Sequence, residues 1–152
     1  LLAVPMEARL LKVLRQNYPN VTRVAMPKSG TCRMHVYIAM KDPAPGQAKN
    51  AAAAALGEDL SLKLAVVVDD DVDVSSDQDV MWALCTRMQA DADVDILTNC
   101  MGAILDPSNH DGLTAKMIID ATKPNGGNFP PRHTIPEDTE IRARELIKKN
   151  LK

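Results

Sequence analysis

The feature that most constrains this chain is a run of five apolar residues, LAVVV, at positions 64–68. Three of the five are β-branched and no polar residue interrupts them, which predicts a strand buried on both of its faces. Strands of this kind occur in sheets that helices cover on both sides. The sequence therefore predicts an α/β fold with a mixed, mostly parallel sheet flanked by helices. At 152 residues, the chain has the length of a single domain, spanning 1–152.

An acidic run follows this strand directly, with aspartates at 69–71 and at Asp73. In open α/β sheets, ligands bind beyond the carboxyl ends of the strands, and carboxylates are the ligands that Mg²⁺ and Ca²⁺ prefer. The run has no EF-hand spacing, however, and the side-chain oxygens at 75–77 are typical caps for a helix beginning near Gln78. Solvation of the strand end together with helix capping is the favoured interpretation, and a metal cradle is the alternative.

Apolar spacing and turn residues predict the remaining elements. Helices are expected at 6–17, 47–56 and 136–151, and strands at 21–26, 32–40, 93–98 and 116–121. A segment rich in Gly, Pro and Asn, at 99–113, is predicted to be a loop, and long loops in compact domains tend to be functional. The terminal helix within 137–152 has a narrow apolar stripe, so we expect it to pack on a neighbouring subunit rather than in its own core.

Charge and composition exclude some classes of function. The net charge is −2 and aromatic residues make up 3% of the chain, so neither a basic surface nor a set of stacking rings for nucleic acid is present. Cys32, Cys85 and Cys100 have no CxxC spacing, which favours free thiols in a reducing compartment over a zinc site. Because neither a signal peptide nor a long apolar run is visible, we expect a cytoplasmic protein without a transmembrane segment.

Short motifs give little chemistry by themselves. His35 lies alone in a predicted strand, where a hydrogen-bonded structural role is commoner than catalysis. The turn KSGT at 28–31 lacks the GxxxxGK[ST] pattern of a P-loop, although Lys28 and the backbone amides there remain available to an anionic group. The motifs of nucleophile elbows, zinc proteases and dinucleotide-binding folds do not occur. Residue patterns alone thus predict an α/β domain of unspecified chemistry.

An ordered series of longer segments is more informative. These are RMHVYIAMK (33–41), PGQAKNAA (45–52), VVVDDDVDV with DVMWALCTR (66–87), DGLTAKMIIDATKP (111–124) and FPPRHTIPED (129–138). In order and spacing the series resembles the carboxy-terminal domain of the UbiD-type decarboxylases, which use prenylated FMN. Two departures stand out: MGAIL at 101–105 replaces the family's PGxPL or GFPL, which leaves room for a substituted ring, and Ile118 replaces a glycine.

The resemblance implies a carboxy-lyase that performs reversible, non-oxidative decarboxylation of (hydroxy)aromatic or unsaturated acids. In this family the catalytic Glu/Arg set lies in the amino-terminal and central parts, so no catalytic residue and no metal ligand is expected in this chain, and the chain alone should be inactive. Prenylated FMN with a divalent metal such as manganese, and potassium, is implied for the full-length enzyme. None of these is expected to bind the fragment alone.

Roles carry over residue by residue. Lys28 and Arg87 match cofactor-binding positions. Thr31, Cys32 and Met34 match strand positions that face the substrate. Ala103, Ile104 and Leu105 match a loop that covers the substrate ring, which makes the 99–113 segment a lid candidate.

The resemblance also implies partners. They are an aromatic carboxylic acid, the remaining amino-terminal part of the enzyme and further copies in a homo-oligomer, with no nucleic acid. In this interpretation the domain closes over the cofactor and the substrate and mediates oligomerisation. A non-catalytic assembly or binding module that shares the same domain is the alternative.

Overall fold

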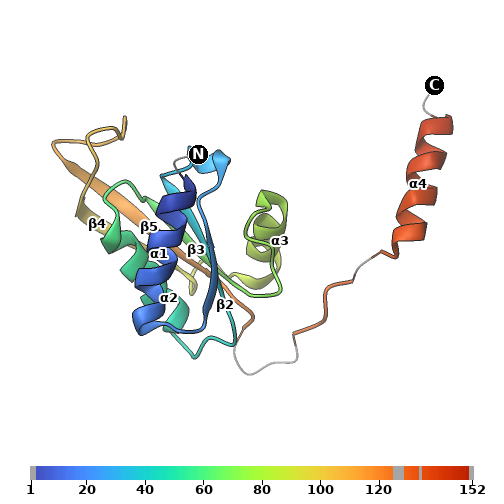
Figure 1. The fold of residues 1–152 in the computed structure, drawn as a ribbon, viewed down its shortest axis with the longest axis horizontal. Helices are drawn as coiled ribbons and strands as arrows, with labels where there is room; N and C mark the ends of the chain where they lie inside the picture. The colour runs from blue at the N-terminus through green and yellow to red at the C-terminus, as the bar shows by residue number, and fades with distance from the viewer. Residues whose placement is uncertain (1–2, 125–128, 134, 151–152) are drawn as a thin grey trace.

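The structure, a computed structural model, describes residues 3–124, 129–133 and 135–150. In chain order its elements are α1 (Ala3–Asn17), β1 (Val21–Ala25), the short 3-10 helix η1 (Lys28–Gly30), β2 (His35–Met40), α2 (Gln47–Glu58), β3 (Leu64–Asp69), α3 (Asp77–Arg87), β4 (Val94–Met101), β5 (Leu113–Ala121) and α4 (Glu137–Asn150). Helices and strands alternate through most of the chain (Figure 1), as the sequence predicts for an α/β fold.

The five strands form one sheet in the order β1-β2-β3-β5-β4. Strands β2, β3 and β5 are parallel, while β1 pairs with β2 and β4 pairs with β5 in antiparallel fashion. The predicted mixed α/β sheet is confirmed, but its parallel part is limited to the three central strands. The reason is that β1–β2 and β4–β5 follow each other through short connections, which permit only antiparallel pairing.

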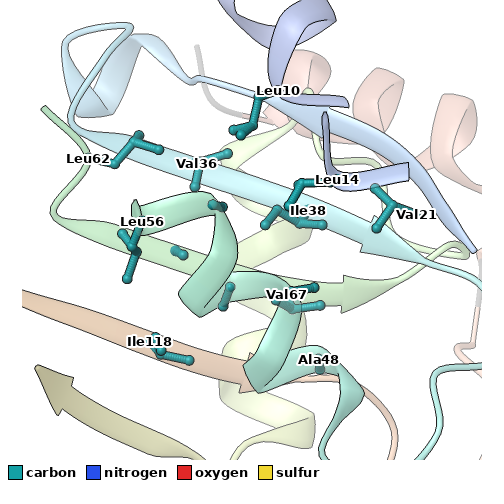
Figure 2. Packing of buried hydrophobic residues seen from close by; sticks show 14 of the residues in the cluster. Leu10, Leu14, Val21, Val36, Ile38, Ala48, Leu56, Leu62, Val67 and Ile118 are labelled. Carbon is teal, nitrogen blue, oxygen red and sulfur yellow. The ribbon is translucent and has the colours of Figure 1, made fainter. Parts of the chain in front are cut away.

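Strand β3 lies at the centre of the sheet and is buried on both faces, as predicted. Its residues from Ala65 to Val68 are all inaccessible to solvent. On one face it packs with α1 and α2 (Figure 2), through a cluster that includes Leu10, Leu14, Val36, Ile38, Ala51, Ala55, Val67 and Ile118. On the other face it packs with α3 and the segment before it, through Tyr37, Ala39, Val66, Val68, Val72, Val74, Val80 and Ala83. Both faces are therefore covered by helices.

Two of the predicted boundaries that differ from the structure bear on the site, and backbone conformation explains each. The strand expected at 32–40 begins only at His35, because Thr31 and Cys32 adopt positive φ angles of 58° and 59° that no strand allows. The loop expected at 99–113 is shorter, because β4 continues to Met101 and β5 begins at Leu113. Asn99, at φ 56°, lies within a register shift of β4 and hides the strand alternation there.

Helix α4 lies away from the sheet (Figure 1), and every side chain described in it is exposed. The segment that leads to α4 is attached to α3. Arg132 forms an ion pair of 3.0 Å with Asp79, and its guanidinium lies 4.3 Å from the centre of the Trp82 ring. The side chains described in α4 thus lie outside the two core clusters, and its packing on a neighbouring subunit stays a prediction.

We expect the core and α4 to contribute very differently to stability. Ile38→Ala should lower the free energy of unfolding by about 2–5 kcal/mol, because it leaves a cavity in the main cluster. Deleting residues 140–152 should change the same quantity by less than about 0.5 kcal/mol, since the residues it removes from the described part of α4 are all exposed. Denaturant titration followed by circular dichroism measures both. A truncated chain that unfolds would show that α4 belongs to the core.

Candidate functional site

The amino ends of the parallel strands meet at one edge of the sheet, which we call the amino edge. The turn before β2 (residues 31–34) and the loop between β4 and β5 (residues 102–112) both lie there, because β2 starts and the β4–β5 hairpin turns at this edge. Lys63, just before β3, contacts both. Its backbone N–H donates to the carbonyl of Met34 at 2.8 Å, and its Nζ lies 2.8 Å from the Asp106 carboxylate.

The 31–34 turn is conformationally strained. Thr31 and Cys32 are consecutive non-glycine residues with left-handed backbone angles, which is costly, above all for β-branched threonine. Backbone hydrogen bonds hold the turn in place, from the N–H of Cys32 to the Pro27 carbonyl (3.0 Å) and from the N–H of Met34 to the Gly30 carbonyl (2.8 Å). The family-derived substrate positions Thr31, Cys32 and Met34 therefore lie in a strained turn and not in a strand. Strain of this kind concentrates at functional sites.

Lys28 opens η1 and is exposed, and the rest of η1 is fixed from two sides. The Ser29 hydroxyl donates to Asp77 Oδ1 at 2.8 Å, and the buried Tyr37 donates its hydroxyl to the same oxygen at 3.0 Å. Gly30 packs so closely on His35 that a Cβ at Gly30 would lie 2.5 Å from the Cβ of His35. The η1 helix, and Lys28 with it, is thus held against β2 and the start of α3.

Burial sets the protonation of the two ionisable groups behind η1. Partial burial lowers the pKa of His35 below its usual value, and the negative charge of Asp77 opposes that shift only in part. Burial likewise raises the pKa of Tyr37. Both groups are therefore neutral near pH 7, and His35 is half-buried at the start of β2.

The 102–112 loop presents an apolar tip. Ile104 is 99% exposed and Leu105 is 78% exposed, next to the half-buried Ala103. Asp106, immediately after them, is buried. The hydrogen bond from Lys63, together with those from Ser108, lowers the pKa of Asp106 to about 2. Two exposed aliphatic side chains, on a loop held in place through the buried Asp106, suit contact with an apolar ligand or partner.

Arg87 lies at the opposite, carboxyl edge of the sheet. Its side chain is 1% exposed and forms ion pairs with Asp69 (2.7 Å) and Asp71 (2.9 Å). The guanidinium also lies over the rings of Trp82 and Phe129, 4.9 Å and 5.4 Å from their centres. Lys28, the 31–34 turn and the 102–112 loop share the amino edge, but the structure does not bring Arg87 to it. Binding of a cofactor by Arg87 stays a prediction.

The segment from Asp69 to Ser76 forms ion pairs with Arg87 at one end and caps α3 at the other. Ser76 caps α3, accepting a hydrogen bond from the Asp79 N–H at 3.2 Å, which confirms the capping interpretation. Strand-end solvation is wrong for Asp69, which is buried against Arg87. Burial raises the pKa of Asp71, but the hydrogen bonds and charges of Arg87 and Lys123 outweigh that effect and lower it to about 2. In the part of the chain that the structure describes, no group of three His, Cys, Asp or Glu residues is placed to hold a metal ion.

Sequence reasoning missed Lys63, Tyr37 and Asp106 as parts of the site. Lys63 and Asp106 are 43 positions apart in the sequence and belong to no motif, so only the pairing of β3 with β5 reveals their contact. Asp77 carried a signal, because it stood among the capping candidates. Since Ser76 takes the cap, the carboxylate of Asp77 is left to bind Ser29 and Tyr37.

Comparison with known proteins identifies the family. The sequence profile of the 3-octaprenyl-4-hydroxybenzoate carboxy-lyase C-terminal domain matches residues 1–121. The chain belongs to the UbiD family. An anhydromevalonate phosphate decarboxylase of Aeropyrum pernix is 44% identical to this UbiD domain over 124 residues, covering 82% of the chain and 28% of the relative. A phenolic acid decarboxylase of Sedimentibacter hydroxybenzoicus is 37% identical over 159 residues, covering 97% and 33%.

A solved structure agrees with the sequence relatives. The UbiD-class enzyme HmfF from Pelotomaculum thermopropionicum, in complex with FMN, superposes with a TM-score of 0.83 at 39% identity, covering 94% of this chain and 33% of that one. This UbiD domain thus spans about a third of the length of the relatives it matches. Among the helices that the structure describes, none has the length and apolar character needed to cross a membrane.

The packing of η1 on His35 predicts a position-specific effect of two matched glycine substitutions. Gly30→Ala should destabilise the UbiD domain by about 1–3 kcal/mol and shift the NMR signals of residues 28–31, because the new Cβ collides with His35. Gly57→Ala is the control. It lies in α2, where an added Cβ meets no atom within 4 Å, and should be neutral or stabilising by up to about 1 kcal/mol. Equal effects at both sites would contradict the packing.

The charge of Asp77 should control the titration of His35. Because burial lowers the pKa of His35 in the folded state, its neutral form contributes stability above pH 6.5, and this contribution is lost as pH falls through the folded pKa. Asp77→Asn should move the NMR titration midpoint of His35 further down, since a charge that favours the imidazolium is removed. Asp79→Asn, two positions along the same helix turn and paired with Arg132, should leave the midpoint in place.

Proposed function

We propose that this UbiD domain is part of a carboxy-lyase that decarboxylates (hydroxy)aromatic or unsaturated acids. The observation that carries the proposal is the arrangement at the amino edge, where the strained 31–34 turn and the apolar tip of the 102–112 loop are both tied to Lys63. Relatives named as decarboxylases of anhydromevalonate phosphate, phenolic acid and gallate support the reaction class. They also support both substrate types, aromatic and unsaturated.

The residues of the amino edge would contribute binding and exclusion of water rather than bond breaking. In this proposal Ala103, Ile104 and Leu105 cover the apolar part of the substrate, and Thr31, Cys32 and Met34 line its other side. Apolar covers of this kind remove water, which strengthens the interactions of nearby fixed charges. The carboxylates and arginines that act directly on the substrate would belong to the amino-terminal part of the enzyme.

Prenylated FMN is the proposed cofactor, and it would supply an electron sink for the carbon that loses carbon dioxide. Structures similar to this chain are in complex with FMN and with prenylated FMN. Lys28 fits such a group, because it is exposed at the start of the fixed η1 helix, where its ammonium would be accessible to an anionic phosphate. Arg87 fits less directly, since two aspartates already neutralise it. We propose that Arg87 acts by fixing the carboxyl edge, and that residues outside this chain hold the divalent metal and potassium.

Self-association is the second part of the proposal. A structure similar to this chain is an evolved dimeric form of HmfF, and the exposed α4 carries the apolar side chains of Ile141, Leu146 and Ile147 on its surface. We propose that α4 packs on another copy of the enzyme. The deletion of residues 140–152 should then lower the number of copies per particle, which light scattering at micromolar concentration measures. An unchanged number of copies would show that α4 is not part of the interface.

Carbon dioxide release tests the catalytic proposal. We expect the full product of the gene that encodes this chain, loaded with prenylated FMN, to release carbon dioxide from at least one aromatic or unsaturated acid. The 152-residue chain with the same cofactor should release none, because the proposed acid–base set is not in it. Turnover by the chain alone would contradict this division of roles. A loaded gene product that is inactive with every acid of the panel would favour the alternative, a cytoplasmic assembly or binding module.

A further inference from the structure

The 102–112 loop is organised around one carboxylate. Asp106 Oδ1 accepts hydrogen bonds from the backbone N–H and the hydroxyl of Ser108, at 3.0 and 2.9 Å. Its Oδ2 lies 2.8 Å from Lys63 Nζ and 3.3 Å from the Thr114 hydroxyl. With its side chain 4% exposed, Asp106 is the buried centre of a loop whose neighbouring residues Ile104 and Leu105 are exposed.

The rest of the loop closes on itself. Asn109 donates from its backbone N–H to the Asp106 carbonyl at 3.0 Å and from its side chain to the Ala103 carbonyl at 3.1 Å. Its side-chain oxygen accepts from the Gly112 N–H at 2.8 Å, and the Gly102 N–H donates to the Gly112 carbonyl at 2.9 Å. A loop with this many internal hydrogen bonds is preformed, and its role as a lid stays a prediction.

Lys63 connects this preformed loop to the strained turn. Its side chain reaches Asp106 and Ser108, and its backbone N–H, like that of Leu64, donates to the carbonyl of Met34. Its own carbonyl accepts from the Met117 N–H in β5 at 2.7 Å. One residue thus fixes both parts of the amino edge, one through its side chain and the other through its backbone.

We propose that Lys63 and Asp106 are positioning residues, which hold the apolar tip of the 102–112 loop at a set place relative to the 31–34 turn and thereby limit the size of the acid that the site accepts. This inference rests on the proposed function. The charge of Lys63 is essential to it, because its removal leaves the buried carboxylate of Asp106 without a compensating charge. In Lys63→Met, the Asp106 carboxylate would keep its hydrogen bonds from Ser108 and Thr114 but would have no cation beside it.

Four variants separate this role from general stability. Lys63→Met keeps most of the side-chain stem and removes the cation, Asp106→Asn keeps the shape and removes the anion, and Lys63→Arg keeps the charge. Lys49→Met is the matched control. It removes the ion pair between Lys49 and Asp95 (2.7 Å), which involves the other end of the same strand β4.

Hydrogen exchange tests the structural half without any catalysis. In the full gene product, Lys63→Met and Asp106→Asn should raise the exchange rates of the amides of Ser108, Asn109 and Gly112 about tenfold, because the loop loses its centre. Lys63→Arg and Lys49→Met should leave these rates within about threefold of the parent. Unchanged rates in both charge-removing variants would overturn the proposal, whatever the activity of the protein.

Substrate selectivity tests the functional half. With a series of acids of increasing bulk, Lys63→Met should raise KM for the preferred acid about tenfold, change kcat less, and reduce the preference over bulkier acids, since the released loop no longer limits size. Lys63→Arg should keep KM and the preference for the smaller acid close to those of the parent. Faster exchange with unaltered selectivity would overturn the positioning role. Faster exchange in a gene product that is inactive towards every acid would refute the proposed function and, with it, the size limit.

Discussion

The burial of β3 on both faces is the constraint on which the rest of this structure depends. With Ala65 to Val68 excluded from water, the strand needs α1 and α2 on one face and α3 on the other. That arrangement also separates the ends of the strands into two edges with different chemistry. The amino edge presents an exposed lysine, a strained turn and an apolar loop, while the carboxyl edge encloses an arginine between carboxylates and aromatic rings.

The carboxyl edge illustrates how a charged group is tolerated inside a small domain. Arg87 is neutralised by Asp69 and Asp71 and lies against two aromatic rings, yet its Nε atom lacks a hydrogen-bond partner among the described residues. A buried pair of this kind returns little net stability, because desolvation of both charges offsets their attraction. It does favour one arrangement of the end of β3 and the end of α3 over others. Carboxylates that look from sequence like metal ligands are therefore occupied by an internal cation.

The fold was largely predictable from sequence because its determinants are local. The apolar run at 64–68, the alanines of α2 and the cap at Ser76 each act within a few residues of where they stand, and the structure confirms all three. Boundaries failed where a single residue left the regular backbone, as at Thr31 and Asn99. The left-handed angles of Thr31 and Cys32 have no signal in spacing or hydrophobicity, so the sequence predicts a strand from residue 32 where the structure has a turn.

The site was predictable only in part, because its members are joined through tertiary contacts. Family resemblance pointed to Lys28, Thr31 and Ile104, and the structure places these three at one edge. Of the groups that hold them, Lys63 and Asp106 belong to no motif, and Asp77 was only a candidate for the helix cap. All three are linked to their partners through tertiary contacts. Arg87 shows the converse. A motif match singled out the residue, but its burial with Asp69 and Asp71 was visible only in three dimensions.

The attachment of Arg132 to Asp79 and Trp82 has a consequence for how α4 meets other molecules. Without that contact, the tether of the helix would begin at the end of β5, and α4 would sample a wide volume. With it, the tether begins at α3 and is short. The local concentration of the helix is then high at surfaces within its reach and vanishes at all others. The surfaces that α4 can reach are therefore those within the span of the few residues between Arg132 and Glu137.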